Sequence, residues 1–134
     1  METLFSNQYA NIFLHGTSAK TLELQWLDFT PSAAFRTVLQ EVVRLAQQYR
    51  VQALIADNRL IRALRPADLA WSGEFVLKGL SELGSRRFAV VESLDAMNRM
   101  GVTSMVSSVI PDTNLASQFF STIEQARAWA MQSQ

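Results

Sequence analysis

The sequence predicts an α/β fold with a single mixed sheet, in which an antiparallel hairpin precedes mostly parallel strands. Three observations lead to this prediction. An alternating apolar and polar stretch ends near residue 27, a long helical periodicity follows it, and short apolar runs then alternate with helical segments. Such alternation is typical of parallel strands joined by right-handed crossovers. We expect the order ββαβαβαβα in one domain that spans residues 1–134.

The first two predicted strands form the hairpin. They cover residues 9–15 and 20–27, with a turn at 16–19. In the second strand Leu22, Leu24 and Trp26 alternate with polar residues, as in a strand that is buried on one face.

The next two elements are a helix and a buried strand. Thr30 and Pro31 are expected to start the helix, with threonine as the cap and proline in the first turn. Apolar residues follow at spacings of three and four up to Tyr49. A short apolar run then predicts a central strand that ends at Asp57.

The rest of the chain is expected to hold three more helices and two more strands. A helix should run from Pro66 to about Gly84, a strand over 87–92, a helical region over about 94–110 that Gly101 divides, a strand over 115–120 and a final helix. Ser121 to Glu124 has the pattern of a capping box, which is expected to start the final helix.

Composition excludes several classes of function. Twelve acidic residues balance twelve basic ones, so no net field attracts nucleic acid. There is no cysteine and one histidine, which excludes thiolate and multi-histidine metal sites. No apolar run is long enough for a membrane helix, and no secretion signal is visible. We expect a cytoplasmic protein with no cofactor, no metal and no membrane insertion.

The strand end Leu54-Ile-Ala-Asp57-Asn58-Arg59 and the helix start Pro66-Ala-Asp68-Leu-Ala-Trp71, together with the order of elements, resemble a family of small bacterial STAS-like proteins. Their fold is akin to that of anti-sigma factor antagonists, and the similarity covers about residues 9–129. The resemblance implies a module that binds other proteins. In the antagonists a serine at the start of the helix after the central strand is phosphorylated, but residues 57–66 here contain no serine or threonine, so the resemblance does not extend to that switch.

The end of the central strand is one candidate site. Asp57, Asn58 and Arg59 lie where ligands usually meet an open α/β sheet. Arg62 and Arg65 follow at intervals of three, so a helical turn would place the three arginines on one side. With the N-terminus of the next helix they could bind an anion, such as a small acidic ligand. The alternative is that Asp57 caps a turn or pairs with an arginine while the other arginines are solvated.

A second candidate site lies on the helix that starts at Pro66. Its core stripe has apolar residues and a glycine at helical spacing, namely Leu69, Gly73, Val76, Leu77, Leu80 and Leu83. At about 100° per residue, Trp71 and Phe75 fall on the opposite side with Lys78 and Glu82. Aromatic residues are enriched in interfaces, so this face is a candidate interaction surface. The alternative is that the hairpin or the 60–65 loop covers it.

A third candidate site is an apolar pocket under the helical region 94–110. Met97, Met100 and Met105 are flexible side chains that could line it together with Phe120. The alternative is that the methionines fill an irregular core.

These observations lead to one main hypothesis and two alternatives. The main one is a non-enzymatic protein-interaction or regulatory module, which forms a homodimer, binds a protein partner, or does both. An alternative is a carrier of a small ligand or lipid, in which Arg59 meets an acidic headgroup. The other is an enzyme that uses Asp57 as a base or nucleophile, although no phosphate loop or nucleophile elbow accompanies that residue.

Overall fold

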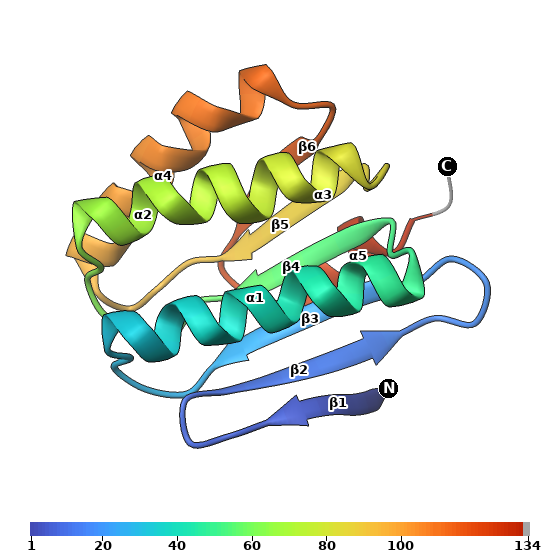
Figure 1. The fold of residues 1–134 in the computed structure, drawn as a ribbon, viewed down its shortest axis with the longest axis horizontal. Helices are drawn as coiled ribbons and strands as arrows, with labels where there is room; N and C mark the ends of the chain where they lie inside the picture. The colour runs from blue at the N-terminus through green and yellow to red at the C-terminus, as the bar shows by residue number, and fades with distance from the viewer. Residues whose placement is uncertain (133–134) are drawn as a thin grey trace.

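The protein folds around a six-stranded sheet whose strands lie side by side in sequence order (Figure 1). The computed structural model describes residues 1–132. The strands are β1 (Glu2–Ser6), β2 (Ala10–His15), β3 (Thr21–Trp26), β4 (Ala53–Asp57), β5 (Arg87–Val91) and β6 (Ala116–Phe120). β1, β2 and β3 pair antiparallel, and β3 to β6 pair parallel. The predicted mixed α/β sheet is confirmed.

The structure adds one strand that the sequence did not predict. β1 pairs with β2 ahead of the expected hairpin, so the order is βββαβαβαβα. Its five residues are all exposed or half-buried, and a register shift interrupts the pairing. A strand this short at a sheet edge has no clear apolar alternation, and pairing with β2 rather than its own pattern defines it.

Three helical crossovers cover one face of the sheet and a single helix covers the other (Figure 1). The first face carries α1 (Ser32–Tyr49), the long helix made of α2 (Pro66–Ser72), a π-helical segment (Gly73–Leu77) and α3 (Lys78–Glu82), and α4 (Ala96–Val109). A short 3₁₀ turn, Ile110–Asp112, follows α4. The opposite face carries α5 (Ile123–Ala130). Because β3 to β6 follow one another in order, right-handed crossovers place all three connections on the same side.

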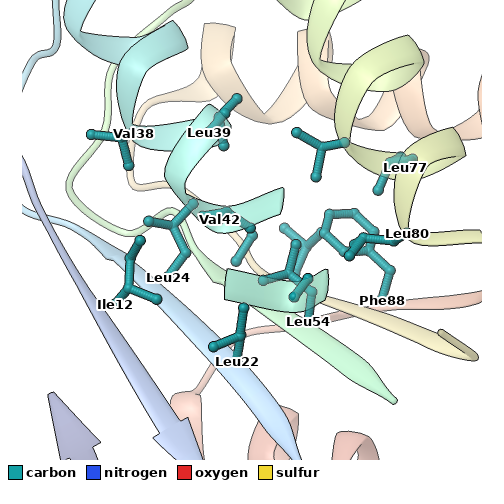
Figure 2. Close-up of a cluster of buried hydrophobic side chains, with 14 of the residues drawn as sticks. Ile12, Leu22, Leu24, Val38, Leu39, Val42, Leu54, Leu77, Leu80 and Phe88 are labelled. Carbon is teal, nitrogen blue, oxygen red and sulfur yellow. The ribbon is translucent and has the colours of Figure 1, made fainter. Parts of the chain in front are cut away.

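The main core lies between the sheet and the three crossover helices. Figure 2 shows side chains of β2, β3, β4 and β5 meeting those of α1 and of the long helix. A smaller apolar cluster lies under α5, where Ala53, Ile55, Ala89 and Val91 contact Ile123, Ala126 and Ala130. Burial on both faces explains why β4 is a continuous apolar run rather than an alternating one.

The helix starts differ in detail from those expected. Pro31 occupies the N-cap position of α1, and the Thr30 hydroxyl instead donates to the Asp28 carbonyl at 3.0 Å. α5 is capped by Thr122, whose hydroxyl accepts from the Gln125 N–H at 3.2 Å. Gly101 does not divide α4, which is continuous.

Two glycines allow α4 to lie close against the long helix. A Cβ on Gly73 would come within 2.7 Å of Val109 Cγ2, and one on Gly101 would come within 2.8 Å of Leu69 Cδ1. Real Cβ atoms do not approach other atoms so closely, so glycine at these positions permits the contact. Gly101 is therefore a packing position rather than a helix break.

Candidate functional site

The carboxyl end of β4 places Asp57 and Asn58 on opposite faces of the sheet. Alternation along the strand gives Asp57 the same face as Ala53 and Ile55, which lie under α5. Asn58 faces the crossover helices, where it lines an apolar cavity. The two side chains therefore do not form one polar site.

Asp57 is buried and is already paired. Arg59 donates to it twice, from Nε to Oδ1 at 2.9 Å and from Nη2 to Oδ2 at 2.7 Å. Its backbone N–H also reaches Oδ1 at 3.3 Å. The hydrogen bonds to Asp57 are the main reason that the pKa of Arg59 is raised. A bidentate pair of this kind is a strong interaction, and it uses the guanidinium that an acidic ligand would need.

Arg62 and Arg65 do not join Arg59 in a helical turn. Residues 59–65 contain a turn followed by irregular chain, and the helix begins only at Pro66. Arg65, the residue before Pro66, is extended, because the α region is disfavoured before a proline. Arg62 and Arg65 are exposed. The predicted cluster of three arginines on one side is therefore wrong.

A second buried carboxylate, Glu23, joins three separate segments, and sequence reasoning did not identify it. Only 1% of Glu23 is exposed. Arg127 of α5 donates to both of its oxygens, at 2.7 and 2.9 Å, and His15 Nε2 lies 2.8 Å from Oε1. The bidentate bond to Glu23 is the main reason that the pKa of Arg127 is raised.

The sequence placed Glu23 on a solvated strand face because Thr21, Glu23 and Gln25 alternate with apolar residues. α5 returns to that face from a position about a hundred residues later, as the sequence separation of Arg127 and Glu23 shows. Nothing local in the sequence predicts where this last helix packs. Only an unpaired arginine on the predicted final helix could have suggested a buried acid nearby.

The aromatic pair of the long helix lies at its junction with α1. The rings of Trp71 and Phe75 are stacked, with centroids 4.9 Å apart, and both are half-buried against the main core. The guanidinium of Arg36 lies 4.9 Å from the centre of a Trp71 ring. Asp68 holds Arg36 in place, accepting from its Nε at 3.0 Å and from the Ser32 hydroxyl at 2.8 Å.

The predicted outward face at Trp71 and Phe75 is thus largely covered by α1 rather than by the hairpin or the loop. Phe75 lies in the π-helical segment, where a π turn holds an extra residue and shifts the phase of the residues after it, whereas Trp71 precedes that segment. Lys78 pairs with Glu74 at 2.9 Å, which raises the pKa of Lys78, and Glu82 is exposed.

The four residues predicted to line an apolar pocket do not meet. Met97 and Met100 are exposed on the outer side of α4, while Met105 is half-buried on its inner side. Phe120 packs against Trp129 on the α5 face of the sheet, with ring centroids 5.8 Å apart. The prediction failed because β6 turns Phe120 toward α5 and α4 turns two of its methionines toward solvent.

A different apolar cavity does lie under α4. Its volume is about 60 Å³, and it is partly open to the surface. It lies between the sheet and the three crossover helices, with Trp26, Phe35, Leu54, Leu77 and Met105 among its walls. Asn58 and Ser72 are its polar residues.

Two further observations concern residues 1–132. No helix in this part of the chain has the length and apolar content needed to cross a membrane. Nor does it contain a group of three or more His, Asp or Glu side chains placed to hold a metal ion.

The chain matches no protein-family model and no curated protein. The candidate sites are therefore judged on their geometry.

Proposed function

We propose that this protein is a non-enzymatic interaction module that pairs with a second copy of itself through the start of α4. The observation that carries the proposal is that four large apolar side chains at or near the start of α4 are exposed, namely Leu60, Leu94, Met97 and Met100, called here the α4 surface. Leu94, Met97 and Met100 are 77%, 66% and 68% exposed. Grouped exposed apolar side chains are a mark of protein contact sites.

The local structure keeps these side chains together. The Leu94 N–H donates to the Arg59 carbonyl at 3.1 Å, which brings the segment before α4 beside Leu60. Asp95 caps α4 by accepting from the Met97 N–H at 2.9 Å, and Met97 and Met100 follow one helical turn apart. The surface thus rests on a defined helix start, and its methionines can adapt to a partner.

A second copy is the partner that fits this surface best. An apolar patch is complementary to itself, as a two-fold interface requires. The formal net charge is zero, so two copies do not repel each other strongly. Arg62 and Asp95 flank the patch: the Arg62 carbonyl accepts from Asn98 in the first turn of α4, and Asp95 caps that turn. A two-fold pairing can therefore set opposite charges at its rim.

The state of the buried carboxylates supports a non-enzymatic role. Asp57 and Glu23 each receive a bidentate arginine, so neither presents a free oxygen pair to a substrate. The STAS-like resemblance belongs to the same proposal, because it implies a fold akin to that of anti-sigma factor antagonists, which favours an interaction module. The small-ligand alternative has support of a different kind, which comes from the cavity under α4.

The test is to place charge on the α4 surface and measure the mass in solution. We expect the wild-type protein to sediment as a dimer at micromolar concentration and the double variant Met97→Glu/Met100→Glu to sediment as a monomer. Charges buried without partners weaken an interface strongly, so the dissociation constant should rise at least about tenfold for each substitution.

Leu83→Glu is the matched control. Leu83 is also an exposed apolar residue, but it lies at the far end of the long helix from the α4 surface. This variant should remain dimeric. A wild-type protein that stays monomeric at high concentration, or a dimer that survives both methionine substitutions, would contradict the proposal.

A further inference from the structure

The cavity between the sheet and the crossover helices has an amide side chain, that of Asn58, in its wall. Asn58 lines the cavity and is only 7% exposed. Its backbone is bonded, since its N–H donates to Val91 and its carbonyl accepts from Ile61. Within residues 1–132 its side-chain amide has no hydrogen-bond partner. The Asn58 side-chain nitrogen and oxygen are not among the fully enclosed atoms without a partner in residues 1–132, so they stay accessible to a small molecule.

One enclosed atom without a partner, Asn98 Oδ1, belongs to a residue that lines a crevice together with Asn58. Asn98 Nδ2 donates to the Arg62 carbonyl at 2.8 Å, but its Oδ1 is buried with no partner in the described part of the chain. Asn58, Asn98 and Val102 line a narrow crevice next to the cavity, and Asn58 and Val102 belong to the walls of both. One end of the cavity region therefore offers both donors and acceptors.

The other polar residue of the cavity does not share this feature. The Ser72 hydroxyl donates to the Leu69 carbonyl at 2.8 Å, within its own helix. The remaining walls are apolar, and Trp26 and Phe35 stack at one side with centroids 5.3 Å apart. A water needs two to four polar partners to be held in such a place, and here it would find only the amides.

The size of the cavity limits what it can hold. At about 60 Å³ it has room for roughly four or five heavy atoms, since one water needs about 10–15 Å³ on the same measure. Met105 forms part of the wall and can change rotamer at low cost. The wall also includes Val76 and Leu77 of the π-helical segment, a distortion that is frequent at functional sites.

Within residues 1–132 no charged side chain lines the cavity itself, while Glu92 and Arg99 line the crevice beside it. Arg59, the expected partner of an acidic headgroup, is bonded to Asp57, which lies on the other face of the sheet. An anion inside the cavity would find no counter-charge among the cavity walls, and burying an unpaired charge is very costly.

We propose that this cavity binds a small uncharged amphiphile, with a short apolar body among the core side chains and a hydroxyl or carboxamide bonded to the Asn58 amide. Such a group both donates and accepts, as the two asparagines require. The assignment is independent of the dimer, because the cavity walls face inward and the α4 surface faces solvent.

Three probes of nearly the same shape test the assignment. Isobutanol is neutral, isobutyrate is an anion and isobutylammonium is a cation. Each is titrated into protein with ¹³C-labelled methyl groups, and the signals of cavity residues are followed by NMR. We expect saturable shifts at Leu54, Leu77 and Met105 with isobutanol at millimolar concentrations, and at least tenfold weaker binding of both ions.

Three variants locate the binding. Asn58→Leu removes the amide and should weaken isobutanol binding at least tenfold. Ala56→Val fills part of the cavity without altering Asn58 and should weaken it as well, so the test does not depend on one variant folding. Ser72 lines the same cavity, but its hydroxyl is already bonded to the Leu69 carbonyl. Ser72→Ala should therefore leave the affinity for isobutanol within about threefold of the wild-type value. No saturable shift with isobutanol, binding that Asn58→Leu and Ala56→Val both leave intact, or tighter binding of isobutyrate would overturn the proposal.

Discussion

At the scale of single residues, Glu23 is the carboxylate that ties α5 to the hairpin. It accepts two hydrogen bonds from Arg127 and lies beside His15, and it is almost fully buried. We expect Glu23→Gln to lower the free energy of unfolding by about 2 kcal/mol, because hydrogen bonds to a charged partner are worth roughly that much. Urea denaturation measures this change.

Glu41→Gln is the control for that substitution. Glu41 pairs with Arg44 on the outer side of α1, and exposed pairs contribute little. The hydrogen bond from Arg44 lowers the pKa of Glu41, so its small contribution exists at neutral pH and is lost as the pH falls below the ordinary value of 4.5. Equal losses of stability in the two variants at pH 7 would contradict the role assigned to Glu23.

Single residues also show which features of the candidate site the sequence does not predict. The sequence predicts polar residues at the end of β4. It does not predict that Asp57 and Asn58 lie on opposite faces of the sheet. Asp57 could be predicted to pair with an arginine, which was one of the two alternatives. Asn58 without a partner could not be predicted, since the bonding of an amide is a property of its surroundings rather than of its neighbours in the chain.

At the scale of elements, the contact between α4 and the long helix depends on Gly73. Gly73→Ala would press a methyl group against Val109 and Met105, and overpacking usually costs about 1–3 kcal/mol. Part of that cost is offset by the better helix propensity of alanine, worth about 1 kcal/mol. We expect a net loss of about 1 kcal/mol in thermal or urea unfolding.

Gly79 provides the opposite case in the same helix. A Cβ there would meet nothing within 4 Å. Gly79→Ala should therefore stabilise the protein by up to about 1 kcal/mol through propensity alone. If both alanine variants change stability in the same direction and to the same extent, the close packing at Gly73 is not what requires glycine.

The elements with a clear period were predicted, and those defined by their contacts were not. α1 has apolar residues at regular helical spacing, and β4 is a short apolar run between two helices, so both follow from the sequence. β1 has no such pattern. The π-helical segment has no local signature either: it places a further residue in the helix where Gly73 meets α4, and it shifts the phase of the residues that follow it.

At the scale of the whole molecule, three helical crossovers cover one sheet face and a single helix covers the other. Three crossovers enclose the main core and the cavity, while α5 alone covers the opposite side near β4 and β5 (Figure 1). α4 is the element shared by the two proposals, since Val102 and Met105 line the cavity and Met97 and Met100 point outward. Ligand binding and pairing can therefore be measured separately, because they involve different side chains of α4.

The measurement that tests the central claim most directly is a methyl NMR spectrum of methionine-labelled protein over a dilution series. The chain has five methionines. Pairing through the α4 surface predicts that the signals of Met97 and Met100 shift as the dimer dissociates, while those of Met1 and Met131, also exposed, remain fixed. If Met97 and Met100 do not shift across the concentrations at which the mass changes, or if the mass never changes, pairing through the α4 surface is wrong.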